Sequence, residues 1–116
     1  MSIKYTLRNE AKAIIIAMEG RIVTDNDTAD ILKEIQGKIE EEYKVFYFDL
    51  NQLEYITSSG LNFFVRILTR TRNVSAEVIL CGIQGNVEKL FAISKLNEIF
   101  TFSSSLNEAL NNVNAN

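Results

Sequence analysis

The amino-acid sequence predicts an α/β domain, in which about four helices pack on a small mixed β-sheet of about four or five strands. Strand-like apolar runs alternate along the chain with segments whose apolar residues recur every three or four positions. Two of the runs, Val45–Phe48 and Val78–Cys81, have no polar interruption, which is typical of strands buried on both faces of a sheet. The 116 residues are 47% hydrophobic and 23% charged, as in ordinary globular proteins, so residues 1–116 are expected to form a single domain.

The N-terminal third of the chain predicts a hairpin followed by a helix. Residues 3–8 alternate between apolar and polar side chains, residues 13–18 are all apolar, and the polar pair Asn9–Glu10 lies between them. This pattern indicates two antiparallel strands. Apolar side chains then recur over Ile31–Tyr43 at the spacing of one helical face, and the polar segment Thr24–Asp27 is able to cap the start of that helix.

The middle of the chain predicts a parallel strand-helix-strand unit with a right-handed crossover. A helix is expected from Ser58, because an apolar face with the spacing i, i+3, i+4, i+7 follows, formed by Leu61, Phe64, Val65 and Leu68. The strands on either side of it are residues 45–48 and 78–81. The segment between the first strand and the helix, Asp49–Thr57, is predicted to be a long loop.

The C-terminal third predicts a short helix over residues 87–91 and a brief extended segment over residues 99–102. Ser105 and Glu108 then have the spacing of a capping box at the start of a last amphipathic helix. Residues 111–116 are expected to fray.

The composition excludes several classes of function. The chain has no histidine, which removes imidazole as a metal ligand, general base or proton shuttle. Its net charge of −3 argues against a nucleic-acid partner, and Cys81 lies in an apolar run that favours a small buried side chain over a reactive thiol. No apolar stretch approaches the roughly 20 residues that span a bilayer, and the first residues lack the apolar core of a signal peptide. We therefore expect a cytoplasmic protein with no membrane span, no direct nucleic-acid partner and no cofactor or metal.

Consecutive hydroxyl side chains at Thr57, Ser58 and Ser59 are the first candidate site. Helix capping explains them, because Ser and Thr accept hydrogen bonds from the free amides of a first turn. A regulatory phosphoacceptor is the alternative, since a phosphate there would meet the positive end of the helix dipole. A serine hydrolase does not fit, because a base is missing and Ile56 stands where a GxSxG motif has its first glycine. A serine–lysine pair stays open, although no motif supports one.

The second candidate site is the loop Gly82–Gly85, whose GxxG spacing also occurs in clamps for single-stranded nucleic acid. No basic residue flanks it, so a tight turn between a strand and a helix is the favoured interpretation. No GxxxxGK loop for nucleotide phosphates occurs. The carboxylates are scattered: Glu40–Glu42 end a helix, and Asp25 and Asp27 look like caps, so an acid/base pair is unsupported.

The stretch FDLNQLEYITSSGLNFFVRIL, from Phe48 to Leu68, resembles the signature of the STAS domain in bacterial anti-sigma factor antagonists. The matching positions are Asp49, Leu50, Leu53, Ile56, Ser58, Ser59, Gly60 and Leu61. The later segment ILCGIQGNVEKLFAISKLNEIFTFSSSLNEAL is similar to the closing half of the family. The resemblance covers essentially the full chain and implies a STAS-like fold.

The resemblance implies a partner-switching protein without catalytic activity. In the family, the unphosphorylated antagonist binds a serine kinase anti-sigma factor, which releases the sigma factor. The kinase phosphorylates the serine that corresponds to Ser58, and a metal-dependent serine phosphatase reverses this step. By position in the family, the expected partner contacts are Thr24, Thr57, Ser58, Ser59, Gly60, Asn62, Phe63, Arg66, Gly82 and Gln84. A monomer or weak dimer is expected.

Two departures from the family pattern affect the expected site. Thr57 stands where most members have aspartate just before the phosphoacceptor, so Thr57 and Ser59 are alternative acceptors to Ser58. The segment Thr24–Asp27 is longer and more polar than the usual turn, and it is a candidate for partner selection. The alternative function is a STAS module that serves as a regulatory or structural subunit, for example of a lipid transporter or of a partner switch without a sigma factor.

Overall fold

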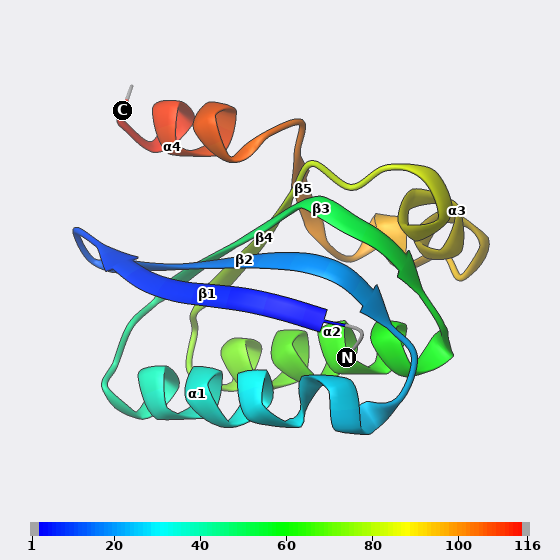
Figure 1. Ribbon diagram of the computed structural model, residues 1–116. Helices are drawn as coiled ribbons and strands as arrows, with labels where there is room; N and C mark the ends of the chain where they lie inside the picture. Colours follow the sequence, from blue (N-terminus) through cyan, green and yellow to red (C-terminus); the bar gives the residue numbers. More distant parts are fainter. Residues whose placement is uncertain (1–2, 115–116) are drawn as a thin grey trace.

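The structure of the protein is a computed structural model that describes residues 3–114 (Figure 1). A five-stranded sheet has the order β1-β2-β3-β4-β5, in which β1 is antiparallel to β2 and the other neighbours are parallel. The strands are β1 (Ile3–Glu10), β2 (Ala13–Ile22), β3 (Val45–Ile56), β4 (Glu77–Cys81) and β5 (Thr101–Ser103). The described α-helices are α1 (Ala29–Glu40), α2 (Ser58–Asn73), α3 (Gly85–Ile93) and α4 (Leu106–Asn114), with short 3-10 turns η1 (Asp25–Thr28) and η2 (Leu96–Glu98). The predicted mixed sheet with four helices is confirmed.

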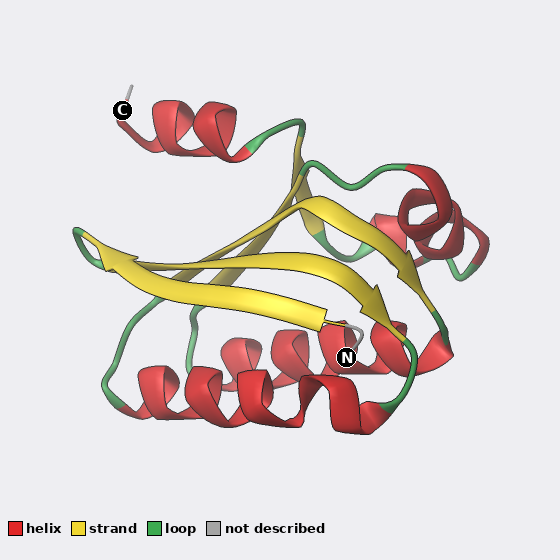
Figure 2. Cartoon of the chain, viewed as in Figure 1, coloured by secondary structure: helices red, strands yellow, loops and turns green. Residues whose placement is uncertain are grey.

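Helices cover both faces of the sheet (Figure 2). Helices α1 and α2 lie on one face, α4 lies over the other, and α3 lies near the end of β3. Phe46 and Phe48 of β3 belong to the large core, whereas Tyr47 between them points to a smaller cluster with Ala109 of α4. This alternation explains the uninterrupted apolar sequence of β3, because successive side chains of a strand point to opposite faces.

Cys81 lies in the smaller cluster beneath α4 and is fully buried. Burial, with a smaller contribution from Asp49, raises the pKa of the Cys81 thiol to about 12. The thiol is therefore protonated at neutral pH, and the prediction of a small buried side chain is confirmed. Within residues 3–114, no helix has the length and apolar character needed to cross a bilayer.

The first hairpin and helix form, with shifted boundaries. Strand β1 continues to Glu10, which pairs with Ala13, so the turn is Ala11–Lys12 and not Asn9–Glu10. Ala11 adopts a φ of 58° there. Helix α1 ends at Glu40, before the predicted limit at Tyr43. The polar segment after β2 forms the turn η1, in which the Asp27 carboxylate accepts hydrogen bonds from the backbone N–H groups of residues 23 and 24 (2.8 and 3.0 Å).

The prediction of a loop over Asp49–Thr57 is wrong, because β3 continues without a break to Ile56. Leu50, Leu53 and Ile56 are buried, so the inward side chains recur every three residues and not every two. The pairing of β2 with β3 has register shifts between Ala17 and Glu19 and again between Gly20 and Arg21. These bulges place an extra residue on β3 and hide the alternation by which a strand is recognised.

The C-terminal segments also form, although α4 runs to Asn114, which makes residues 111–114 helical where fraying was expected. Residues 115–116 of the expected frayed end lie outside the described residues. Only one of the two hydrogen bonds of the predicted capping box forms. The Glu108 N–H donates to Ser105 Oγ (3.1 Å), but the Glu108 carboxylate accepts a hydrogen bond from the Ser104 hydroxyl.

Candidate functional site

Three connections meet where the parallel strands end, and we call residues 22–28, 56–62 and 82–86 together the carboxyl edge. Ile22 and Ile56, the last residues of β2 and β3, pair with one another. The chain then continues from β2 into η1 and from β3 into α2 (Figure 1). Crevices outside the carboxyl ends of parallel strands are the usual place for ligands and partners in open α/β sheets.

Thr57 joins two of these connections. It is the N-cap residue of α2, with an extended backbone, and its Oγ1 accepts a hydrogen bond from the Ser59 N–H (3.2 Å). The same hydroxyl donates to the Val23 carbonyl (2.8 Å), and the Thr57 N–H donates to the Ile22 carbonyl (3.0 Å). The hydroxyl of Thr57 therefore caps the helix and fixes the chain after β2 beside it.

Ser58 is the first residue of α2 and is exposed. Because Thr57 caps the helix, the Ser58 hydroxyl is not needed there, and it makes no hydrogen bond to any residue that the structure describes. Ser59 is only half-exposed. A phosphate on Ser58 would lie at the positive end of the α2 dipole, where negative charge is stabilised.

Asn62 and Arg66 are exposed and follow Ser58 at intervals of four residues on α2. This spacing places the three side chains on one face of the helix. Thr24 and Val23 are exposed on the neighbouring connection, and Val23 is 44% exposed although its side chain is apolar. Sequence reasoning missed Val23, because a single valine after a strand carries no signal of exposure.

Phe63 does not belong to this surface. Its side chain is 2% exposed and packs edge-to-face on Phe48 and Phe64, with ring centroids 6.2 and 5.0 Å apart. The prediction that Phe63 contacts a partner is wrong for its side chain, because the ring is already enclosed by the core. Gly60 is buried as well, and a Cβ there would lie 2.6 Å from the Cβ of Ile56, so only glycine fits without a shift.

The loop after β4 is a tight turn, as predicted, because Gly82 and Gly85 adopt φ values of 73° and 56°. Gln84 is exposed, and its Nε2 donates to the Asn51 carbonyl (2.8 Å). Asn86 Oδ1 accepts a hydrogen bond from the Ile56 N–H (2.9 Å), which connects α3 to the end of β3. Sequence reasoning missed Asn86, since an asparagine in a first helical turn is ordinary.

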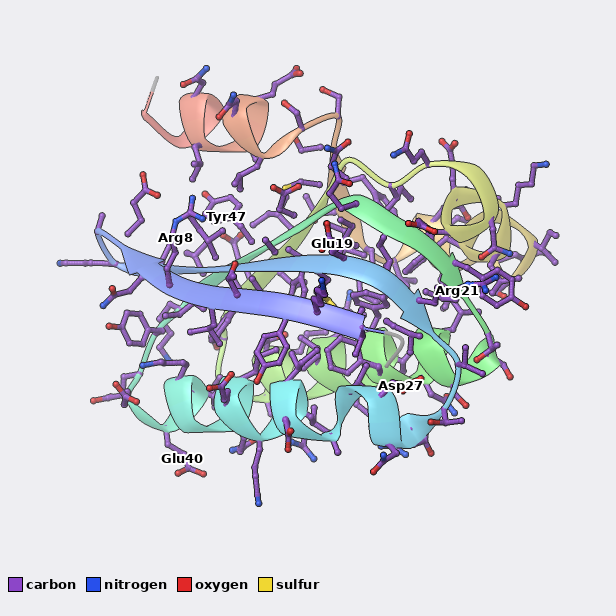
Figure 3. The ribbon with its side chains drawn as sticks, viewed as in Figure 1. Arg8, Glu19, Arg21, Asp27, Glu40 and Tyr47 are labelled. Atoms are coloured by element: carbon purple, nitrogen blue, oxygen red, sulfur yellow. The ribbon has the colours of Figure 1, made fainter. Side chains whose placement is uncertain are left out.

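The carboxyl edge carries charge but no metal-binding group of side chains. Asp27 lies at the connection between β2 and α1 (Figure 3), and Asp25 is exposed beside it. Next to this edge, one residue before it on β2 and on β3, the Arg21 guanidinium lies 4.8 Å from the centroid of the Tyr55 ring. Among the residues that the structure describes, no group of three or more His, Cys, Asp or Glu side chains is arranged to hold a metal ion.

Comparison with known proteins identifies the family. The model of the STAS domain matches residues 4–109. The chain belongs to the STAS domain family. This STAS domain is similar to BtrV of Bordetella bronchiseptica, whose name describes an anti-sigma factor antagonist. The two sequences are 26% identical over 102 residues, which are 88% of this chain and 87% of BtrV.

Solved structures share the fold of this STAS domain. The unphosphorylated form of the anti-sigma factor antagonist SpoIIAA has a TM-score of 0.83 at 18% identity, covering 97% of this chain and 98% of SpoIIAA. The phosphorylated form of SpoIIAA, from Bacillus, has a TM-score of 0.77 at 18% identity, covering 95% of this chain and 99% of SpoIIAA. An anti-sigma factor antagonist from Mycobacterium paratuberculosis has a TM-score of 0.81 at 18% identity, covering 97% of this chain and 95% of that protein.

Proposed function

We propose that this STAS domain is an anti-sigma factor antagonist that binds a serine kinase anti-sigma factor while Ser58 is unphosphorylated and releases it when Ser58 carries a phosphate. The observation that supports it most is the exposed Ser58 hydroxyl, free of hydrogen bonds to described residues, in the first turn of α2. The names of BtrV and SpoIIAA and the match to the STAS domain support the class of partner.

The different surroundings of the Thr57 and Ser58 hydroxyls favour Ser58 as the phosphoacceptor. The Thr57 hydroxyl is half-buried and already donates to one backbone group and accepts from another, whereas the Ser58 hydroxyl is exposed. Phosphorylation of Thr57 would break the cap and the contact to Val23, which costs stability. Phosphorylation of Ser58 leaves both interactions in place, so the domain stays folded in both states.

Charge explains how a phosphate on Ser58 would release a partner. A phosphoserine adds about −1.5 to −2 charge at neutral pH. The η1 turn beside α2 already carries Asp25 and Asp27, so the modification makes a negative surface more negative. A partner that covers Ser58, Asn62 and Arg66 would have to desolvate the phosphate, and burial of an unpaired charge is costly. A metal-dependent serine phosphatase would restore binding, and both steps would take place in the cytoplasm.

The test compares three forms of the protein as baits in lysate of the source cells: the native chain, Ser58→Glu and the control Asn107→Glu. Asn107 is exposed on α4, away from the carboxyl edge, so its substitution adds the same charge elsewhere. We expect the native chain and Asn107→Glu to capture a serine-kinase-like ATPase, identified by mass spectrometry. Ser58→Glu should bind it at least about tenfold more weakly, a difference of about 1.4 kcal/mol.

Incubation of the captured kinase with ATP then locates the phosphate. We expect one phosphate on Ser58, its loss in Ser58→Ala and its retention in Ser59→Ala. Equal capture of the kinase by all three baits contradicts the switch. Capture of transporter subunits by all three baits, with no kinase, assigns the domain instead to a regulatory subunit of that assembly.

A further inference from the structure

A cavity of about 1020 Å³ lies on the face of the sheet that α4 covers, and its lining includes no residue from the first turns of α2, where Ser58 lies. Ala13, Val45 and Ile79 of the sheet line it together with Ala109 and Leu110 of α4. It continues past the short strand β5 toward the last turns of α2. Its size and its apolar lining are those of sites that bind small organic molecules.

Tyr47 gives this cavity a polar group. Strand β3 directs Phe46 and Phe48 into the large core and Tyr47 to the opposite face, where Tyr47 lies between the sheet and α4 (Figure 3). Tyr47 is 2% exposed and lines the cavity, and its hydroxyl makes no hydrogen bond to any residue that the structure describes. The hydroxyl is nevertheless not sealed in, since no fully enclosed side-chain oxygen without a partner occurs among the described residues.

Because the Tyr47 hydroxyl has no hydrogen-bond partner among the described residues but reaches the cavity, water or a bound molecule has to satisfy it there. The hydroxyl also stays neutral, because burial raises its pKa, with Cys81 and Glu77 adding to the effect. Tyr47 thus presents a hydrogen-bond donor beside the apolar side chains that the sheet and α4 contribute to the cavity. Such an arrangement recognises a polar atom on an apolar molecule.

The charges around the opening limit the kind of molecule that enters. The lining side chains include the carboxylates of Glu10, Glu77 and Glu108 against the cations of Lys12 and Arg72. The Arg72 guanidinium also donates a hydrogen bond to the carbonyl of residue 99 (3.1 Å). Glu10 is itself paired with Arg8 (3.6 Å), so charges of both signs balance at the opening, and the lining residues form no cluster of cations that would hold an anion such as a fatty acid or a nucleotide.

We propose that the cavity between α4 and the sheet binds a neutral, mainly apolar small molecule that carries one hydrogen-bond acceptor, and that the Tyr47 hydroxyl donates to this acceptor. The site shares no side chain with the carboxyl edge. It is therefore independent of the proposed function, and either proposal can fail without the other.

Nile red is a suitable probe, because it is neutral, apolar and carries a carbonyl acceptor, and its fluorescence rises in an apolar site. We expect saturable binding of one dye by the native chain. Tyr47→Phe removes only the hydroxyl and should weaken binding about three- to tenfold. The matched control is Tyr43→Phe, because the Tyr43 hydroxyl lies elsewhere and accepts a hydrogen bond from Asn9 Nδ2 (3.0 Å). This control should bind the dye like the native chain.

A second variant and a second measurement make the test independent of one substitution. Ala109→Phe fills the cavity from α4 and should abolish binding. Methyl NMR spectra of the native chain should show dye-induced shifts at Ile79 and Ala109 but not at Ile93, which is 77% exposed on α3. Non-saturable binding, equal affinity of Tyr47→Phe and the native chain, or shifts centred on Ile93 would each overturn the proposal.

Discussion

Gly60 and Gly37 both lie in helices but differ in the space around them, so we expect substitution by alanine to have opposite effects on stability at the two positions. Gly60→Ala places a Cβ 2.6 Å from the Cβ of Ile56, an atom close to the backbone that cannot move aside easily. We expect a loss of about 1–3 kcal/mol in the free energy of unfolding. Gly37 in α1 has nothing within 4 Å of its Cβ position, so Gly37→Ala should stabilise by about 0.5–1 kcal/mol. Urea unfolding checks both, and a stabilising Gly60→Ala would contradict the steric account.

The helix α2 shows which single residues the sequence was able to place and which it was not. Six of the eight side chains from 61 to 68 are apolar, so more than one stripe with helical spacing fits the segment. The prediction took Leu61 and Val65 as inward, whereas the structure buries Phe63 and Ile67 and leaves the other two half-exposed. Only the packing of α2 on β3 decides between these stripes, and that packing is not a local property of the sequence. The prediction of Ser58 as the acceptor rests on its place in a family motif, which does not depend on the stripe.

At the level of elements, strands and helices were predicted well where their period is regular. The hairpin, the buried strand Val45–Phe48 and the crossover to β4 follow from local patterns and are present. The second half of β3 was not found, because two bulges change the spacing of its buried residues from two to three. A bulge depends on the partner strand, so the chain of β3 alone does not reveal it. The same holds for Asn86, whose acceptor role requires β3 and α3 to be adjacent.

Asn86 is expected to hold the end of β3 against α3. Asn86→Ala leaves the partly buried N–H of Ile56 without its acceptor, which should cost about 1–2 kcal/mol of unfolding free energy. Asn107→Ala is the matched control, since the Asn107 side chain is exposed and makes no hydrogen bond to a described residue, and it should change stability by less than about 0.5 kcal/mol. Hydrogen exchange by NMR should show faster exchange of the Ile56 amide in Asn86→Ala alone. An unchanged exchange rate would mean that another group protects this amide.

For the whole molecule, strand β3 connects the two proposed sites. Its last residue, Ile56, leads through Thr57 to the exposed Ser58, while Tyr47 in its first half lines the cavity beneath α4. Phe48, next to Tyr47, packs on Phe63 of α2. The large core therefore separates the two sites and holds each on a rigid strand or on the helix that follows it, as precise binding geometry requires.

The pH dependence of stability is a property of the whole fold, and three groups with raised pKa values, Cys81, Tyr5 and Tyr47, contribute to its alkaline side. Burial raises the pKa of the Cys81 thiol to about 12, and a hydrogen bond with Glu34, followed by burial, raises the pKa of Tyr5 to about 12. The folded chain keeps these protons at a pH where the unfolded chain has already released them, so stability falls as pH rises above about 8.5 for the thiol and about 10 for the phenol. Each group contributes a slope of at most about 1.4 kcal/mol per pH unit.

Cys81→Ala isolates the contribution of the thiol, because it leaves Tyr5 unchanged. Between pH 7.5 and 10 we expect the native chain to lose about 1–2 kcal/mol more unfolding free energy than the variant, as the unfolded thiol ionises and the folded one does not. Urea unfolding at these two pH values measures the difference, and the comparison of slopes cancels the cost of the smaller side chain at neutral pH. Equal losses in the two proteins would mean that the thiol ionises as readily in the folded chain as in the unfolded one, and that α4 opens far enough to admit water to the cluster around Cys81.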